Sequence, residues 1–205
     1  MKKFLLIAIY LIHLSCAYTI AQNPSWANKA AKAVFTVKTF KADGTLIASS
    51  NGFFISENGD AVSLYTPFVN AHRAVVIDAQ GKELPVECIL GANEMYDVIK
   101  FRVFSGKVAS VNLAANNENT ENMIWLLPYT MKKTGLCRPG TIESIAMFMD
   151  NYAYYTILQK PQENTDGCPY FNQKGEVIGI SQPATTQNNK SYAISAQFAY
   201  SLKIN

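Results

Sequence analysis

The sequence predicts an all-β protein that consists of two β-barrels and a short C-terminal helix. Short segments rich in β-branched and aromatic residues recur along the chain, and turn residues separate them at fairly regular spacing. A polar run over 114–122, heavy in Asn and Glu, interrupts this pattern near the middle of the chain. The strands therefore fall into an N-terminal and a C-terminal set, one for each barrel.

The strands of the first set lie between clear turn signals. Residues 34–40 are rich in β-branched and aromatic side chains, and Asp43-Gly44 marks the turn that follows. The tetrapeptide Glu57-Asn58-Gly59-Asp60 marks a hairpin turn between two further strands. In residues 98–103 apolar and basic side chains alternate, as in a half-exposed strand. Strands are expected over 34–40, 46–48, 52–56, 61–64, 74–78, 84–90 and 98–103.

Strand character resumes beyond the polar run, in segments rich in β-branched and aromatic residues. Strands of the second set are expected over 123–127, 141–145, 152–158, 175–180 and 192–195. Residues 197–203 are expected to form a short closing helix. The N-terminal barrel is accordingly predicted over 22–115 and the C-terminal barrel over 116–205.

The first 21 residues are predicted to be a signal peptide and not part of the fold. Two lysines precede an apolar run over 4–14, and small residues near Ala21 offer a cleavage site. The run is shorter than the ~20 residues that a membrane span needs. Lipid anchoring at Cys16 is the weaker alternative, because His13 stands where a lipoprotein box has an aliphatic residue. The protein is expected to be secreted or periplasmic.

The mature chain is close to neutral. The leader contains two lysines and no acidic residue, so 16 of the 18 basic residues and all 15 acidic residues remain. This balance gives no indication of nucleic acid or an anionic membrane surface as a partner. The remaining ~184 residues are enough for a sizeable core.

Three cysteines remain after removal of the leader: Cys88, Cys137 and Cys168. Export favours disulfides, but an odd number leaves at least one thiol unpaired. Cys88 lies in an apolar strand-like run and is expected to be a small buried residue. Cys137 with Cys168 is the pairing worth considering, and the sequence does not decide whether it forms.

Four segments, taken in order, resemble the HtrA-type trypsin-like serine peptidases. Gly52-Phe53-Phe54-Ile55-Ser56 and the strand over 61–64 are similar to the segment that leads to the catalytic histidine. Residues 94–101 resemble the segment with the triad aspartate, and residues 164–180 resemble the nucleophile turn and the strand that follows it. Residues 192–195 resemble the next strand. The resemblance covers essentially the whole mature chain and implies a trypsin-like double β-barrel.

The same resemblance implies that the catalytic triad is lost. The histidine position falls on Thr66, the aspartate position is kept as Asp97, and the serine position falls on Asp166. A carboxylate cannot replace the serine alkoxide that attacks a peptide carbonyl. The glycine position that serves the oxyanion hole falls on Asn164, which tolerates unusual backbone angles better than most residues. The oxyanion-hole positions are therefore Asn164 and Asp166.

No other base is available for a hydroxyl nucleophile. His72 is the one histidine of the mature chain, and it is expected on the surface beside Arg73, away from the cleft. Cys168, as a displaced nucleophile, and Thr165, if the alignment slips by one residue, would both lack an adjacent histidine.

Two further interpretations concern polar and aromatic clusters. Asp97 and Asp166, with the Thr66 hydroxyl between them, could form an acid–base pair or a cation site, or they could be relic positions refilled by polar residues. A group of aromatic residues could line a recognition surface or belong to the barrel core. These are Trp125, Tyr152, Tyr154 and Tyr155.

The expected function is that of an exported pseudopeptidase that binds a peptide or protein ligand in the cleft between the barrels, without a metal or cofactor. The enzyme alternative is a serine-type endopeptidase-family hydrolase with a rearranged active site. A third possibility is a structural component of the cell envelope. The sequence does not name the ligand, the partner or the oligomeric state.

Overall fold

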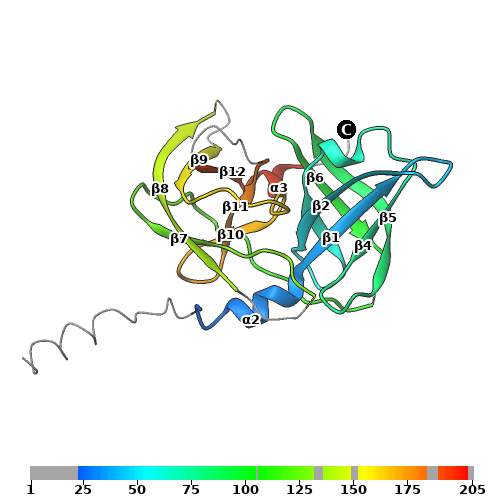
Figure 1. The fold of residues 1–205 in the computed structure, drawn as a ribbon, viewed down its shortest axis with the longest axis horizontal. Helices are drawn as coiled ribbons and strands as arrows, with labels where there is room; N and C mark the ends of the chain where they lie inside the picture. The colour runs from blue at the N-terminus through cyan, green and yellow to red at the C-terminus, as the bar shows by residue number, and fades with distance from the viewer. Residues whose placement is uncertain (1–22, 105, 132–135, 149–151, 184–188, 203–205) are drawn as a thin grey trace, which may run out of the picture.

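The computed structural model describes residues 23–104, 106–131, 136–148, 152–183 and 189–202. The predicted signal peptide and the alternative anchor Cys16 lie outside these residues. Two closed antiparallel β-barrels of six strands each lie side by side (Figure 1). The predicted all-β double barrel is therefore confirmed.

The first barrel has the strand order β1-β2-β3-β6-β5-β4. Its strands are β1 (Val34–Phe40), β2 (Leu46–Phe54), β3 (Asp60–Ser63), β4 (Arg73–Ile77), β5 (Glu83–Asn93) and β6 (Val98–Val103). The second barrel has the order β10-β11-β12-β9-β8-β7. Its strands are β7 (Met123–Leu126), β8 (Arg138–Met147), β9 (Ala153–Leu158), β10 (Pro169–Phe171), β11 (Val177–Ser181) and β12 (Ser191–Ser195).

Short helices lie at the ends of the described chain and after β3. α2 (Ala27–Ala30) and the 3₁₀ helix η1 (Ala31–Ala33) precede β1, and the 3₁₀ helix η2 (Thr66–Phe68) follows β3. α3 (Phe198–Ser201) confirms the predicted closing helix. No helix within the described parts of the chain is both long and apolar enough to cross a membrane.

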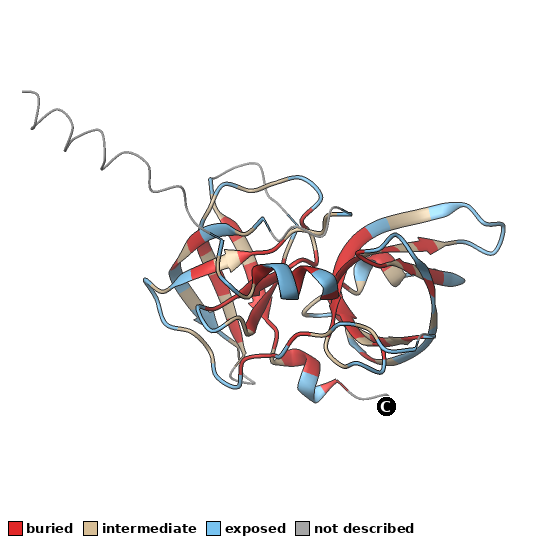
Figure 2. Ribbon diagram, turned by 90° about the horizontal axis from the view of Figure 1, so that it is seen from below, coloured by how far each residue is buried: buried red, intermediate tan, exposed pale blue. Residues whose placement is uncertain are grey.

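Three hydrophobic cores hold the molecule together, and Figure 2 shows buried residues along the inner faces of both barrels. Phe35, Phe54 and Phe101 fill the first barrel, and Tyr155 and Tyr170 fill the second, all at most 1% exposed. The third core lies between the barrels. It takes its members from both barrels, from the connecting segment and from both terminal helices, among them Val34, Phe53, Leu113, Val177, Ile194 and Phe198.

The burial patterns of the strands follow from these three cores. In β6 buried and half-buried residues alternate, because one face of the strand meets the barrel interior. The second half of β2 and all of β11 are buried on both faces, since their outer faces meet the core between the barrels. A strand buried on both faces has no period of two in its hydrophobicity, which explains the apolar run Val177-Ile178-Gly179-Ile180 in β11.

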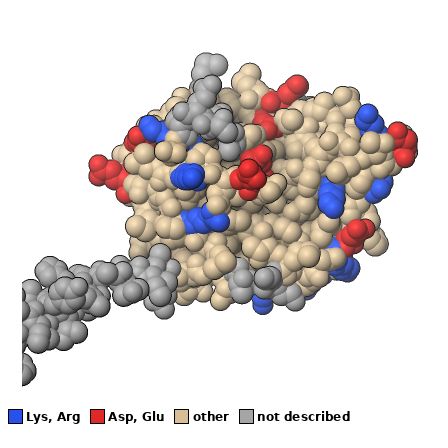
Figure 3. Space-filling model, viewed as in Figure 1, with Lys and Arg blue, Asp and Glu red and all other residues tan. Residues whose placement is uncertain are grey.

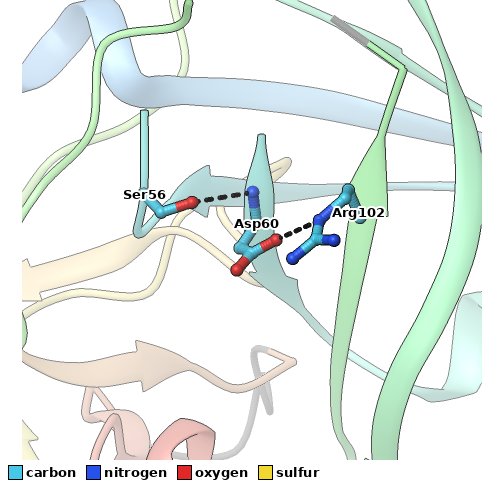
Figure 4. Close-up of polar contacts among 3 residues, drawn as sticks. All are labelled: Ser56, Asp60 and Arg102. Atoms are coloured by element: carbon cyan, nitrogen blue, oxygen red, sulfur yellow. Dashed lines mark hydrogen bonds and ion pairs between the residues drawn. The ribbon is translucent and has the colours of Figure 1, made fainter. Parts of the chain in front are cut away.

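A polar contact on the first barrel joins β3 to β6 and the hairpin turn before β3 (Figure 4). Arg102 Nε donates to Asp60 Oδ1 at 2.6 Å, and the Asp60 N–H donates to Ser56 Oγ at 3.2 Å. The hydrogen bond and charge of Asp60 raise the pKa of Arg102 above its usual value. The contact closes the hairpin that the Asn58-Gly59 turn begins.

Two expectations about the cysteines and strands need correction. Cys88 is exposed, because it lies in a stretch of β5 that faces solvent, so its predicted burial was wrong. Residues 46–54 form one strand where two short ones were expected, since the polar residues between them continue the ladder with β1. Cys137 and Cys168 form no disulfide.

Candidate functional site

The turn that carries Asp166 is bonded to strand β2 of the other barrel. The Asp166 carbonyl oxygen accepts the Asn51 N–H at 2.9 Å, the Ser50 hydroxyl at 3.1 Å and the Asn51 Nδ2 group at 3.1 Å. Asn51 Nδ2 also donates to the Asn164 carbonyl at 2.9 Å. These bonds fix the turn to β2 across the boundary between the barrels through the carbonyl groups of Asn164 and Asp166.

Two residues of this turn have left-handed backbone angles. Asn164 has a φ of 59° and Gly167 a φ of 82°. Asparagine tolerates this region better than most residues with a Cβ, as the sequence predicted for this position. At Gly167 a side chain is also excluded by space, because a Cβ would lie 2.2 Å from the Asn51 carbonyl oxygen. The chain thus keeps a sharply bent turn packed against β2.

Thr66 and Asp97 are in contact. The Thr66 N–H donates to Asp97 Oδ1 at 2.6 Å, and the Tyr65 N–H donates to the Asp97 carbonyl at 3.2 Å. Asp97 itself has a φ of 52°, which a short polar residue tolerates. The Asp97 carboxylate therefore orients Thr66, the first residue of η2, through the backbone N–H of Thr66. The Thr66 side chain at this position is a hydroxyl.

A cavity of about 230 Å³ lies beside the turn, between β1, β2 and the Asp166 segment. Its lining residues are Thr36, Ser49, Ser50, Asn51, Asn164 and Asp166. Thr36 Oγ1 pairs with Asn51 Oδ1 at 3.0 Å and Ser50 Oγ donates to the Asp166 carbonyl, so both hydroxyl protons point to oxygen atoms that are poor bases. Neither Thr66 nor Asp97 is among the described lining residues.

His72 lies elsewhere on the first barrel. It is exposed, and its N–H donates to the Phe40 carbonyl at 2.8 Å. It lines a cavity of about 320 Å³ together with Arg73, Glu87 and Cys88, and it does not line the cavity at Asp166. The Arg73 guanidinium stacks over the Phe40 ring at 4.0 Å. This arrangement agrees with a surface histidine beside Arg73.

The alternative nucleophiles are not activated. Cys168 is fully buried, and burial raises the pKa of its thiol to about 12, which leaves it protonated at neutral pH. The Thr165 hydroxyl donates to the Gln162 carbonyl at 2.9 Å. Within the described ranges no group of three His, Cys, Asp or Glu residues could hold a metal ion.

The aromatic residues named from the sequence lie in three environments. Tyr155 belongs to the second barrel's interior, where burial raises the pKa of its hydroxyl to about 12. Tyr152 stacks on Phe198 at 3.7 Å and Tyr154 packs edge-on to Phe148 at 6.1 Å, so both belong to the core between the barrels. Trp125 is half-buried at the barrel surface.

Ser50 and Asn51 are contributors that the sequence interpretation missed. Both are only 5% exposed, although they are polar and lie inside a strand. Their position directly before Gly52 was the available signal, since a polar pair within a buried strand needs hydrogen-bond partners. Those partners lie more than a hundred residues away in the chain, at the Asp166 turn.

No protein-family model and no curated protein sequence matches the chain. Solved structures do match in fold. The active form of the Rv3671c protease from M. tuberculosis has a TM-score of 0.75 and 14% identity, over 90% of this chain and 85% of that one. The serine endoprotease from Yersinia pestis has a TM-score of 0.69 and 17% identity, over 88% and 66%.

A third similar structure is the HtrA-type protease AlgW with a tripeptide. Its TM-score is 0.71 with 16% identity, over 87% of this chain and 62% of that chain, so this chain spans less than two thirds of AlgW. At these identities the likeness concerns the fold. The chain therefore has the double-barrel fold of the trypsin-like serine proteases.

Proposed function

We propose that the chain is an exported, catalytically inert trypsin-like domain that binds extended peptide segments in the groove between its barrels. The observation that carries the proposal is the pairing of Thr66 with Asp97 at 2.6 Å through the Thr66 backbone. At the position where the fold's enzymes have an imidazole, this chain has a threonine hydroxyl, which cannot accept a proton at neutral pH.

The nucleophile is missing as well as the base, because the serine position of the turn is occupied by the carboxylate of Asp166. Loss of both base and nucleophile would leave the help of binding and the oxyanion hole, roughly 10³–10⁴ over water. This is far below the rate enhancement of an intact triad. The mature chain should therefore behave as inactive in ordinary peptidase assays.

The retained framework supports binding. The turn stays bonded to β2, its left-handed residues are kept at Asn164 and Gly167, and a continuous core joins the barrels. Recognition of an extended peptide by backbone hydrogen bonds needs no triad. AlgW, which has the same fold, was solved with a tripeptide. The predicted signal peptide supports the exported location.

A fluorophosphonate probe tests the inactive half of the proposal. The purified mature protein, which begins at Gln22, is incubated with the probe beside trypsin as a positive control. We expect no adduct by mass spectrometry. An adduct on any serine or threonine would contradict inactivity and favour the hydrolase with a rearranged site.

A peptide library tests the binding half. We expect ligands whose affinity, measured by fluorescence anisotropy, is the same within about threefold in Asp166→Ala, because the Asp166 carbonyl, which the substitution keeps, bonds the turn to β2. Absence of any ligand, together with stable co-purification of another envelope protein, would favour the structural component instead.

A further inference from the structure

A second, larger cavity lies on the outer surface of the C-terminal barrel, apart from the peptidase-like site. Its volume is about 590 Å³, within the range of small-molecule sites. It is formed by β7, the segment before it and the turn after β10, which lie close together in Figure 1. Its lining residues are Glu118, Asn122, Met123, Trp125, Asn172, Gln173 and Lys174.

The aromatic part of this cavity is held rigidly. Trp26 meets the Trp125 ring edge to face, with centroids 6.3 Å apart, and packs on Phe171 in a tilted arrangement, with centroids 4.7 Å apart. The Trp26 indole N–H donates to the Gln173 carbonyl at 3.3 Å. Gly175 makes room for this packing, because a Cβ there would lie 2.6 Å from Trp26 Cγ. Trp125 thus presents a fixed, partly exposed ring to the cavity.

The polar part is fixed as well. Asn172 Nδ2 donates to Glu118 Oε1 at 3.0 Å, and Asn122 Nδ2 donates to Glu118 Oε2 at 2.7 Å. The Glu118 N–H donates to the hydroxyl of the buried Tyr155 at 3.3 Å. Each carboxylate oxygen retains a second lone pair for a ligand, so Glu118 is a positioned acceptor of hydroxyl protons.

The charges of the cavity indicate which ligand it suits. Glu118 supplies one negative charge and Lys174 one positive charge, so the lining does not favour a strongly charged ligand. A pyranose ring has an apolar C–H face, which packs on an aromatic ring, and a rim of hydroxyl groups that both donate and accept. We infer that this cavity binds a neutral oligosaccharide, with one sugar ring on Trp125 and its hydroxyls on Glu118 and Lys174.

The surface beyond the cavity has room for further sugar units. Met123 is paired across the sheet with Thr141, and Thr141 with Leu158. Met123 is 56% and Leu158 50% exposed, so they extend the apolar surface across β7, β8 and β9. This continuity is why an oligosaccharide fits better than a single sugar.

Binding is tested on the mature protein with three neutral probes: cellohexaose, N-acetylchitohexaose and maltohexaose. Each is titrated to about 5 mM, which exceeds a millimolar Kd. Tryptophan emission is a local readout, because Trp26 and Trp125 are the two tryptophans of the chain and are in contact. Saturation-transfer NMR on the sugar gives a second readout that needs no tryptophan. We expect saturable binding of at least one probe.

The variants connect binding to this cavity. Trp125→Ala should weaken binding by roughly tenfold, whereas Trp125→Phe, which keeps a flat ring, should stay within about threefold. Glu118→Gln should weaken binding by about threefold or more, since it loses a charged acceptor. Phe104→Ala, at a 72% exposed position on the other barrel, should leave binding unchanged.

Two results would overturn the inference. One is the absence of binding by any probe in both readouts. The other is equal affinity of wild type, Trp125→Ala and Glu118→Gln. If Trp125→Ala does not fold, Glu118→Gln decides, because glutamine keeps the size of glutamate.

Discussion

Thr66 and Asp166 take part in the structure through their backbones. The Thr66 N–H is bonded to Asp97, and the Asp166 carbonyl accepts bonds from Ser50 and Asn51. These backbone contacts do not require a particular side chain at either position. They are compatible with the proposed exchange of two triad groups without a change in the surrounding shape.

It follows that the two groups should be restorable together. We expect the double substitution Thr66→His with Asp166→Ser to react with a fluorophosphonate at position 166, at least about 100-fold faster than wild type, because a general base contributes 10²–10⁴-fold. Each single variant should stay unreactive, since nucleophile and base act as a unit. Labelling is followed by intact-mass spectrometry. A folded double variant that does not react would show that these are not the serine and histidine positions.

The three thiols within the described residues, Cys88, Cys137 and Cys168, differ in exposure, which predicts their reactivity. Cys88 is exposed, whereas burial raises the pKa of both Cys137 and Cys168 to about 12. With iodoacetamide at pH 8, native protein should be modified at Cys88 alone, and all three thiols should react in urea. Peptide mapping identifies the sites. Modification of Cys168 in native protein at a rate close to that of Cys88 would contradict its burial.

The same thiols should make the fold sensitive to alkali. An unfolded thiol ionises near pH 9, whereas burial, partial at Cys137 and complete at Cys168, raises the pKa of both thiols to about 12 in the folded state. The unfolded state therefore binds fewer protons between these values, so the contribution of these thiols to the free energy of unfolding should be constant below about pH 9 and fall towards pH 12. Urea unfolding as a function of pH measures this, with Cys168→Ala expected to show a smaller fall.

At the scale of elements, the contact between the Asp166 turn and β2 joins the two barrels at the candidate site. Gly167 approaches the Asn51 carbonyl so closely that no Cβ fits. Gly44 has a similar φ of 85°, yet a Cβ there would meet nothing within 4 Å. A comparison of alanine substitutions at the two glycines therefore separates two destabilising effects. One is the strain of a left-handed backbone, and the other is the steric clash with Asn51.

Gly167→Ala should accordingly destabilise the protein far more than Gly44→Ala. We expect about 1–2 kcal/mol for Gly44→Ala from backbone strain alone, and more than about 3 kcal/mol for Gly167→Ala, which adds a steric clash with β2. Urea unfolding followed by circular dichroism measures both. Equal losses would mean that the turn does not pack on β2 as described.

The elements also show what the sequence could predict. Motifs close to each residue singled out Thr66 and Asp97, and the structure has the Thr66 N–H bonded to Asp97. The docking of Ser50 and Asn51 on the Asp166 turn could not be predicted in this way, because periodicity reports on neighbours in the strand and not on partners over a hundred residues away. Cys88 was misplaced because its apolar run in β5 lies partly on an exposed face, where hydrophobic residues are also common.

At the scale of the whole molecule, the core between the barrels makes one unit of two halves. Val34 and Val98 of the first barrel and Val177 and Ile194 of the second meet there, together with Phe198 of α3. On the surface shown in Figure 3 acidic and basic side chains are interspersed, in keeping with the nearly neutral composition. Apolar contact, and not charge, is therefore the main attraction between the halves.

Phe198→Ala should weaken both barrels at once. Phe198 is 2% exposed and contacts the rings of Tyr96 and Tyr152, so its removal should cost about 3–5 kcal/mol. Phe104→Ala, at a 72% exposed site, should cost less than about 0.5 kcal/mol. Tryptophan emission reports on the second barrel and circular dichroism on both. Their unfolding curves should coincide, and separate transitions would contradict a shared core.

The positions of the tryptophans and of the exposed thiol allow the distance between the two barrels to be followed by fluorescence energy transfer. Both indoles lie at the second barrel, and Cys88 is exposed on the first. A dye coupled to that sulfur would receive resonance energy from indoles on the opposite half. Changes in the distance between the barrels, for instance when a ligand binds between them, could then be followed in solution without an engineered cysteine.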